Sequence, residues 1–213
     1  MAKESIHPLN HLSAAEISDA VSILKKNNLD HENSSFSYIS LEEPDKNLVK
    51  KNNDLDRIVK IVGVNQKSIG FQAEINLSKK ELTKEEIISN NAGPTYTLAE
   101  IFMAIQLTIE DENYQKALKK RGIEDLSLIQ IDPWPGGGFV NKNIKKGNRA
   151  LKAISFLKDS EKDNAYAKPI QGLIAHVDLT EKKVVEIEDH GVVKIPKAHA
   201  RYDKDGQESL REN

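Results

Sequence analysis

The 213-residue chain contains no cysteine, so a disulfide framework, a thiolate zinc site and a cysteine nucleophile are all excluded. It has no excess of basic residues: Lys+Arg number 31 and Asp+Glu 33, which gives no electrostatic case for nucleic-acid binding. No apolar run approaches the roughly 20 residues of a membrane span, and the opening MAKESIHPLN holds no apolar signal segment. The composition predicts a cytoplasmic protein without nucleic-acid or membrane partners.

The first 90 residues show one helical pattern followed by strand-like patterns. A capping box, Ser13-x-x-Glu16, predicts the start of a helix, and apolar residues then recur at helical spacing as far as Asn27. Runs typical of strands follow at residues 36–41, 57–64 and 69–75, with a weaker candidate at 81–89. The first half is therefore expected to be a helix and about four strands.

The same order restarts after a candidate linker at residues 90–94, NNAGP. A second capping box, Thr97-x-x-Glu100, predicts another helix, and a further helical segment at 111–121 ends at Gly122. Strands are predicted at residues 128–131, 151–157, 170–178 and 183–188. Strands without intervening helices pair antiparallel, so we predict an α+β fold: two domains, each a helix packed on a curled antiparallel sheet of about four strands. The order of elements repeats, but no sequence repeat is expected.

The stretch DPWPGGGF at residues 132–139 holds the only tryptophan. Its three glycines lack the Gly-Lys-Ser/Thr that lets a phosphate-binding loop hold phosphate and magnesium. Pro133 and Pro135 fix φ on both sides of Trp134, while the glycines let the chain turn afterwards. We interpret the stretch as a stiff turn that presents an indole. The alternative is a core tryptophan that fills the end of the sheet.

Other patterns favour structural roles. The basic run NKNIKK at residues 141–146 is short and has no aromatic residues, so a solvated loop is favoured over nucleic-acid contact. His7 and His11 have i, i+4 spacing but precede the helix, which favours an ordinary pair over a metal site. His176 is predicted to be a hydrogen-bonded strand histidine, and DHG at 189–191 a turn that ends the last strand.

Five segments share residues with a known family: HPL at residues 7–9, LSAAEI at 12–17, SLEEP at 40–44, DPW at 132–134 and DNAYAKPIQGLIAHVDLTEKKVVEIEDHGVVKI at 163–195. Together they resemble the copper-containing primary amine oxidases. The resemblance covers nearly the whole chain but only the N2 and N3 domains of those enzymes, which precede the catalytic domain. It implies cystatin-like folds, with an N2-like domain at residues 1–91, an N3-like domain at 95–200 and a polar tail at 201–213 that begins the linker to the catalytic domain.

The resemblance also implies a chemistry, the oxidation of primary amines to aldehydes with copper and topaquinone, a cofactor made from a tyrosine. In the family, three histidines, two of them as His-x-His, bind copper, and an aspartate is the general base. This chain has no His-x-His, and neither Asn113-Tyr114-Gln115 nor Arg201-Tyr202-Asp203 matches the Asn-Tyr-Asp/Glu context of the cofactor tyrosine. We expect no catalytic residue, metal ligand, bound cofactor or amine oxidation in this chain alone.

By the same resemblance, Trp134, Tyr166 and Phe102 fall at the wall of the funnel that leads to the quinone. Aromatic walls suit an aryl-alkyl amine such as tyramine, through stacking and cation–π attraction. The implied partners are the catalytic domain and a primary amine, in a homodimeric parent enzyme; the fragment alone is expected to be a monomer or weakly self-associated. The alternative function is a free-standing cystatin-like module that binds another protein.

Overall fold

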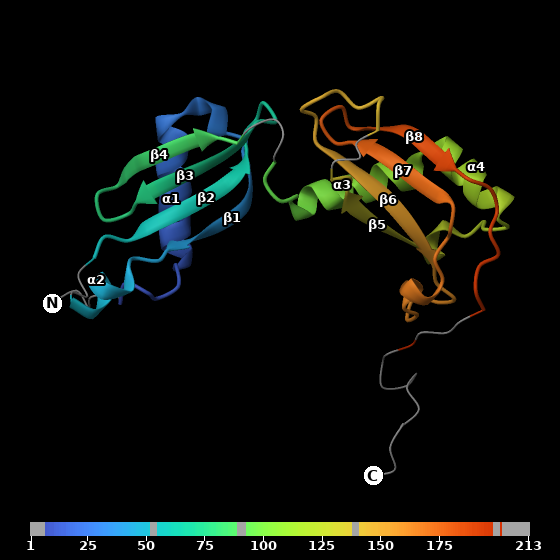
Figure 1. The fold of residues 1–213 in the computed structure, drawn as a ribbon, viewed down its shortest axis with the longest axis horizontal. Coiled ribbons are helices and arrows are strands. Elements are labelled where there is room, and N and C mark those ends of the chain that lie inside the picture. Colours follow the sequence, from blue (N-terminus) through green and yellow to red (C-terminus); the bar gives the residue numbers. More distant parts are fainter. Residues whose placement is uncertain (1–6, 52–54, 89–92, 138–140, 198–200, 202–213) are drawn as a thin grey trace, which may run out of the picture. The chain divides into compact units, whose positions relative to one another are not determined.

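Two units follow one another along the chain, and in each of them helical segments pack on a four-stranded antiparallel sheet (Figure 1). The computed structural model describes residues 7–51, 55–88, 93–137, 141–197 and 201. The chain divides between Thr97 and Leu98. Most of the predicted linker at 90–94 and of the predicted tail at 201–213 lies outside the described residues, and the domain limits stay predictions. None of the described helices is long and apolar enough to cross a membrane.

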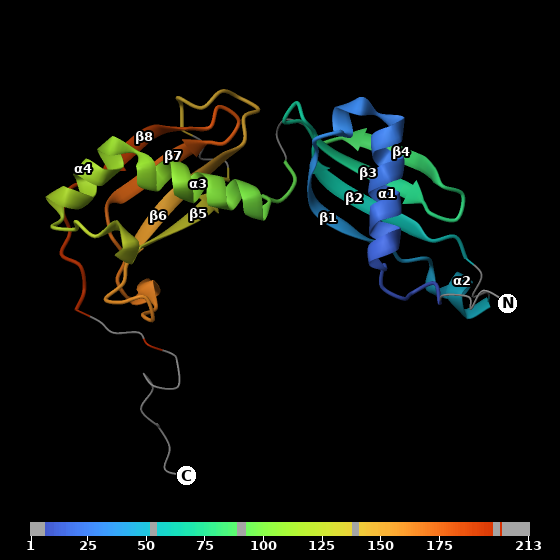
Figure 2. The same cartoon turned by 180° about the vertical axis from the view of Figure 1, so that it is seen from behind.

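In the first unit, helix α1 (Ala14–Asn27) lies across one face of the sheet (Figure 2). The strands pair in chain order: β1 (Ser35–Glu42), β2 (Ile58–Val64), β3 (Gly70–Asn76) and β4 (Glu81–Ile87). Two short helices were not predicted from the sequence: η1 (Leu29–His31) and α2 (Lys46–Lys51). The core joins α1 to the sheet through Ala20, Leu24, Val59, Ile61, Phe71, Ala73 and Ile75.

In the second unit, α3 (Leu98–Glu110) and α4 (Glu112–Lys120) cover one face of the sheet (Figure 2). The strands again pair in chain order: β5 (Ile129–Pro135), β6 (Ala150–Leu157), β7 (Leu173–Asp178) and β8 (Lys183–Asp189). Two 3₁₀ turns, η2 (Leu126–Leu128) and η3 (Ala165–Ala167), lie in the connections. The predicted α+β fold with an antiparallel sheet of four strands in each half is confirmed.

The prediction of a turn around Trp134 is wrong. Strand β5 continues through Pro133 to Pro135, beyond the predicted end of the strand at residue 131. Because β5 is an edge strand, one side of its backbone needs no N–H donor, and prolines are tolerated there. The strand conformation places Asp132 and Trp134 on the same face of the sheet.

Tyr114, whose helical context leaves both a surface and a core position open, lies in the core of the second unit. Its side chain is fully buried on α4, and its hydroxyl lies 2.6 Å from Ser155 Oγ on β6. Burial raises the pKa of the Tyr114 phenol to about 12, although the hydrogen bond with Ser155 acts in the opposite direction. The phenol is therefore a neutral group that fastens α4 to the sheet.

Both units carry the same ion pair between the first turn of the long helix and the residue before the second strand. Arg57 Nε donates to Glu16 Oε1 at 2.5 Å in the first unit, and Arg149 Nε donates to Glu100 Oε1 at 2.5 Å in the second. All four side chains are at most 18% exposed. Removing one partner of such a pair leaves a largely buried charge without compensation, so the pair holds helix and sheet together.

The match extends to the turn after the third strand. An Asn–Asp hydrogen bond closes it in both units, from Asn76 Nδ2 to Asp56 Oδ2 (3.0 Å) and from Asn148 Nδ2 to Asp178 Oδ2 (2.7 Å). The following leucine N–H donates to the carbonyl oxygen of the paired arginine at 2.9 Å in each case. The units are thus a structural repeat, which corrects the expectation that only the order of elements is repeated.

Candidate functional site

The sheet of the second unit has one face that no helix of the described residues covers. Ile131, Ala153 and Ala175 point into the core beneath the helices, so the residues between them point the other way. We call this the outer face of the second unit; it includes Gln130, Asp132, Trp134, Lys152, Ile154, Phe156, Ile174, His176, Glu186 and Glu188. Two of the three predicted channel residues meet on this face.

Trp134 and Tyr166 both donate a hydrogen bond to Asp132. Trp134 Nε1 lies 3.1 Å and the Tyr166 hydroxyl 3.2 Å from the same oxygen, Asp132 Oδ2. The negative charge of Asp132 and this hydrogen bond raise the pKa of Tyr166, which keeps the phenol protonated as a donor. The Tyr166 ring also makes an edge contact with Phe156, with ring centroids 5.0 Å apart.

The rings of this cluster remain accessible. Trp134 is 56% and Tyr166 55% exposed, so the alternative of a core tryptophan is wrong. Asp132 itself is half-buried between them. Asp132 is not among the site residues predicted from the sequence. The i, i+2 spacing of Asp132 and Trp134 was the available signal, but it places two side chains on one face only in a strand, and a turn was predicted there.

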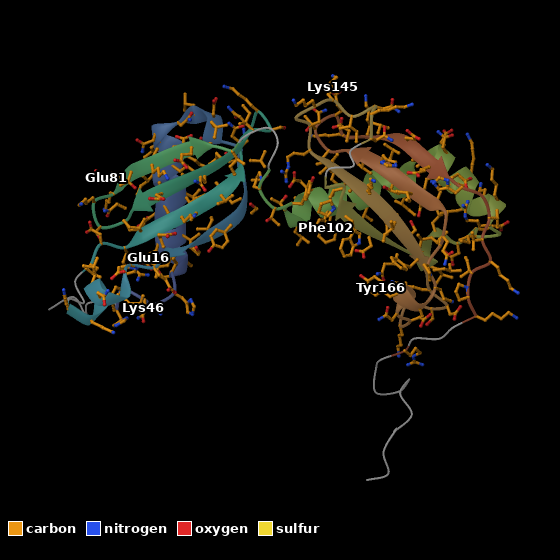
Figure 3. The ribbon with its side chains drawn as sticks, viewed as in Figure 1. Glu16, Lys46, Glu81, Phe102, Lys145 and Tyr166 are labelled. Carbon is orange, nitrogen blue, oxygen red and sulfur yellow. The ribbon has the colours of Figure 1, made fainter. Side chains whose placement is uncertain are left out.

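Phe102 does not join this cluster. It is 59% exposed on α3, the helix that covers the opposite face of the sheet. Figure 3 shows Phe102 near the start of α3 and Tyr166 at the other end of the unit. Two later residues of the helix, Ile105 and Ile109, pack against the core. The structure therefore groups Trp134 with Tyr166 and sets Phe102 apart; a channel role for Phe102 stays a prediction.

His176 is a hydrogen-bonded strand histidine, as predicted. It is 5% exposed, and its Nε2 lies 2.8 Å from Glu188 Oε2 on the neighbouring strand. His190 Nε2 lies 2.6 Å from the other oxygen, Glu188 Oε1. These two hydrogen bonds lower the pKa of Glu188. Across the described residues, no three histidine, aspartate or glutamate side chains are arranged to hold a metal ion.

A serine, a histidine and a glutamate also meet in the first unit. His31 lies between Ser34 Oγ (3.2 Å from Nδ1) and Glu85 Oε1 (2.8 Å from Nε2), the residue types of a hydrolytic triad. The histidine is fully buried, however, and its ring packs on Phe71 with centroids 4.2 Å apart. A substrate cannot reach this ring, so the group is a structural one.

A groove of about 370 Å³ lies in the first unit between α1 and the turn after β3. Its walls include Glu16 and Arg57, which bind each other, and Arg57 also donates to carbonyl oxygens of residues 7, 8, 10 and 11. Burial raises the pKa of Glu16, but hydrogen bonds from Arg57 and Ser13 outweigh it and hold the pKa below its ordinary value. These contacts fasten the segment before α1 to the sheet, so they stabilise the fold and leave no unpaired charge between Glu16 and Arg57 for a ligand.

Family models match both units. The model of the copper amine oxidase N2 domain matches residues 7–58, and that of the copper amine oxidase N3 domain matches residues 99–206. The chain belongs to the copper amine oxidase family. The resemblance inferred from the sequence is thereby confirmed, with the N2 match wholly in the first unit and the N3 match wholly in the second.

Relatives in the copper amine oxidase family are similar along almost the whole chain. It is 32% identical over 197 residues to a primary amine oxidase of Arthrobacter sp. (strain P1) and 35% identical over 205 residues to a primary amine oxidase of Klebsiella aerogenes. Each match covers 92% of this chain but only 30% and 27% of those enzymes. The chain thus spans about a third or less of the length of these relatives.

The fold agrees with a solved member of the family. A copper-containing benzylamine oxidase from Hansenula polymorpha superposes with a TM-score of 0.74 at 15% identity, over 98% of this chain and 36% of that chain. At this identity the likeness concerns the fold alone. It is consistent with two small N-terminal domains of a larger copper amine oxidase.

Proposed function

We propose that this chain is the non-catalytic N2–N3 region of a primary amine oxidase and that the outer face of the second unit forms part of the wall of the substrate-entry channel. The observation that carries the proposal is the pair of accessible rings, Trp134 and Tyr166, held by Asp132. Aromatic side chains with few rotatable bonds supply contact area at a low cost in conformational entropy. A fixed, accessible aromatic surface suits the wall of a channel for organic amines.

The parent enzyme oxidises primary amines with copper and topaquinone, and its catalytic domain supplies the copper ligands, the cofactor tyrosine and the base. Family membership supports this proposal, since relatives named primary amine oxidase match 92% of this chain. A histamine oxidase of Arthrobacter globiformis and the benzylamine oxidase of Hansenula polymorpha carry ring-containing amines in their names. We extend this class to the parent enzyme, as aryl-alkyl amines such as tyramine, because aromatic walls attract them by ~0.5–2 kcal/mol per cation–π contact.

The 213-residue chain alone is expected to bind no stoichiometric copper and to oxidise no amine. The test is copper loading of the purified chain, followed by metal analysis, a redox-cycling quinone stain and an assay of peroxide released from tyramine. The Klebsiella aerogenes enzyme serves as the positive control. Copper bound one to one together with a quinone signal contradicts the assignment of this chain as non-catalytic.

The channel role is tested in a complete enzyme in which this chain replaces the corresponding region of the Klebsiella aerogenes relative, its 35%-identical counterpart. In that chimera, Trp134→Ala is expected to change kcat/KM for bulky aryl amines several-fold more than for methylamine. Tyr38→Ala is the matched control, since Tyr38 is an aromatic of the first unit with 52% exposure. Equal effects of the two substitutions, or an effect of Trp134→Ala on all amines alike, contradict the channel role.

A free-standing module that binds another protein is the second candidate. The observation in its favour is the exposure of Trp134 and Tyr166 on a sheet face that no described helix covers. The coding sequence that follows residue 213 separates the two candidates. A β-rich region with Asn-Tyr-Asp/Glu and His-x-His favours the amine oxidase, and a stop codon or an unrelated domain favours the module.

A further inference from the structure

The carboxylate of Asp132 uses only one of its two oxygens in the aromatic cluster. Oδ2 accepts the hydrogen bonds of Trp134 and Tyr166, and in the described part of the chain no hydrogen bond or ion pair reaches Oδ1. We infer that Asp132 is the ammonium-binding residue of the outer face: a primary aryl-alkylammonium ion pairs with this carboxylate and lays its ring against Trp134 and Tyr166. The choice of ligand class rests on the proposed function.

The charge of Asp132 is not neutralised by a neighbouring cation of the sheet. Lys152 lies opposite Trp134 on the adjacent strand, and no ion pair joins its ammonium group to Asp132 among the described residues. Lys168, on the connection that carries Tyr166, binds Asp159 instead. Among the described residues, no cation therefore occupies the second oxygen of Asp132 beside the two accessible rings.

This combination distinguishes a cation from a neutral molecule of the same shape. An ammonium group donates a charge-assisted hydrogen bond to a carboxylate, about twice as strong as a neutral hydrogen bond, and is attracted to aromatic faces. A neutral aryl alcohol gains only the contact with the rings. Trp134 and Tyr166 supply the surface for the aryl group, so a simple alkylammonium ion without a ring is expected to bind less well than an aryl-alkylammonium ion.

The structure provides a direct sensor for this site. The chain has one tryptophan, so a ¹H–¹⁵N spectrum contains one indole Nε1–H signal, and that proton is the one donated to Asp132. The experiment is a titration of the 213-residue chain with phenethylammonium chloride, 2-phenylethanol and butylammonium chloride at constant ionic strength. It is repeated on Asp132→Asn, on Tyr166→Phe and on Asp19→Asn, where Asp19 is an exposed carboxylate of the first unit.

The expected result is a saturable shift of the indole signal by phenethylammonium, with an affinity about tenfold or more above that of 2-phenylethanol. Asp132→Asn is expected to abolish this tenfold preference, while Asp19→Asn leaves it unchanged. Tyr166→Phe keeps the carboxylate and is expected to retain the preference. Folding of each variant is read from the dispersion of the same spectra.

Two outcomes overturn the inference. Equal affinity for phenethylammonium and 2-phenylethanol shows that the rings bind without help from the carboxylate, and the channel-wall proposal is then untouched. No saturable shift with any probe, or an unchanged preference in Asp132→Asn, removes Asp132 as the ammonium-binding residue. The proposed function fails separately, through the selectivity of the chimeric enzyme with Trp134→Ala, so the two failures are distinguishable.

Discussion

On the sheet face turned away from α1, the first unit carries mostly charged and amide side chains, whereas the corresponding face of the second unit adds Trp134, Phe156 and two isoleucines to its polar residues. In the first unit, Glu86 pairs with Lys84 at 3.0 Å and accepts a hydrogen bond from Gln72 at 2.6 Å. Those hydrogen bonds lower the pKa of Glu86. In the second unit, the equivalent surface holds Trp134 and Ile154.

The interiors, in contrast, follow one plan. Each unit joins its helix to its sheet through a glutamate–arginine pair and closes its third strand with an Asn–Asp hydrogen bond. The two units therefore share these interior contacts, while their outer faces differ. An antiparallel sheet with one solvated face is normally polar on that face, so the rings and isoleucines on the outer face of the second unit favour the proposal that this surface contacts a ligand or a partner.

The largest expected effect tests the shared interior. Arg57→Ala and Arg149→Ala are each expected to lower the free energy of unfolding by about 3–5 kcal/mol, because a glutamate that is mostly buried loses its partner. The effect should be confined to one unit. Trp134 lies in the second unit, so its emission should report early unfolding of that unit in Arg149→Ala. In Arg57→Ala the first unit should unfold early, and circular dichroism should detect this while the Trp134 emission does not change.

Matched controls use exposed pairs of the same units. Lys67 pairs with Asp30 in the first unit and Lys145 with Glu181 in the second, and both lysines are more than half exposed. Alanine at either lysine is expected to leave the stability nearly unchanged, because solvent screens an exposed ion pair. If Arg57→Ala and Arg149→Ala lower the free energy of unfolding no more than these controls do, the two buried pairs do not have a common stabilising role.

The next effect tests an ion pair of the second unit that has no counterpart among the described residues of the first. Arg121, with a side chain only 1% exposed, donates from Nη2 to Asp189 Oδ1 at 2.7 Å and to the carbonyl oxygens of Gly172 and Gly191. The hydrogen bond from Arg121 to Asp189 and a second one from the Gly191 N–H lower the pKa of Asp189 to about 2. The position that matches Asp189 in the first unit is Ile87, which is 60% exposed.

Asp189→Asn is expected to lower stability at pH 7 by about 1.5–3 kcal/mol, the contribution of a hydrogen bond to a charged group. The pKa is lower in the folded state than the ordinary value of about 3.9, so the stabilisation is complete above about pH 4 and is lost as the pH falls towards 2. Denaturant unfolding of wild type and variant from pH 7 to pH 2 measures this. A constant difference across that range contradicts the ion pair as its cause.

Much of the fold was predictable because its local signals agree with its packing. The capping box at Ser13 and Glu16 is present, with Glu16 Oε2 accepting from the Ser13 N–H at 2.8 Å. The alternating run at 69–75 became β3, whose odd-numbered residues from Phe71 to Ile75 are buried. The helix α2 was missed because six residues give fewer than two turns, too few to show a helical period.

The repeat was missed because its spacing is not constant. Matching residues are separated by 84 positions between Glu16 and Glu100, by 92 between Arg57 and Arg149, and by 102 between Asn76 and Asp178. The signal lies in short motifs: Ser/Thr-x-Ala-Glu-Ile at 13–17 and 97–101, Asp/Asn-Arg at 56–57 and 148–149, and Asn/Asp-Leu-Ser/Thr at 76–78 and 178–180. Loops of unequal length between them hide any fixed period.

The candidate site was only partly predictable. Trp134 and Tyr166 came from the family resemblance, but their common partner Asp132 depends on a contact between a strand and a loop 34 residues away in sequence. Such a contact follows from sheet register and loop packing and leaves no local pattern. Phe102 shows the converse. The resemblance grouped it with Trp134, and the sheet separates the two because α3 packs on the opposite face.

The smallest expected effect concerns the outer faces themselves. Trp134→Ala is expected to lower the free energy of unfolding by about 1 kcal/mol or less, because the indole is 56% exposed, against ~3–5 kcal/mol for a buried tryptophan. Tyr38→Ala, on a 52% exposed ring of the first unit, should have an effect of similar size. In the parent protein, the Trp134 emission should be red-shifted and open to acrylamide quenching. Denaturant midpoints followed by circular dichroism compare the two variants.

A blue-shifted, quencher-resistant emission, together with a large loss of unfolding free energy in Trp134→Ala alone, would mean that the indole stabilises the second unit from within. The aromatic face would then be part of the core, and the contrast with the polar face of the first unit would say nothing about ligands.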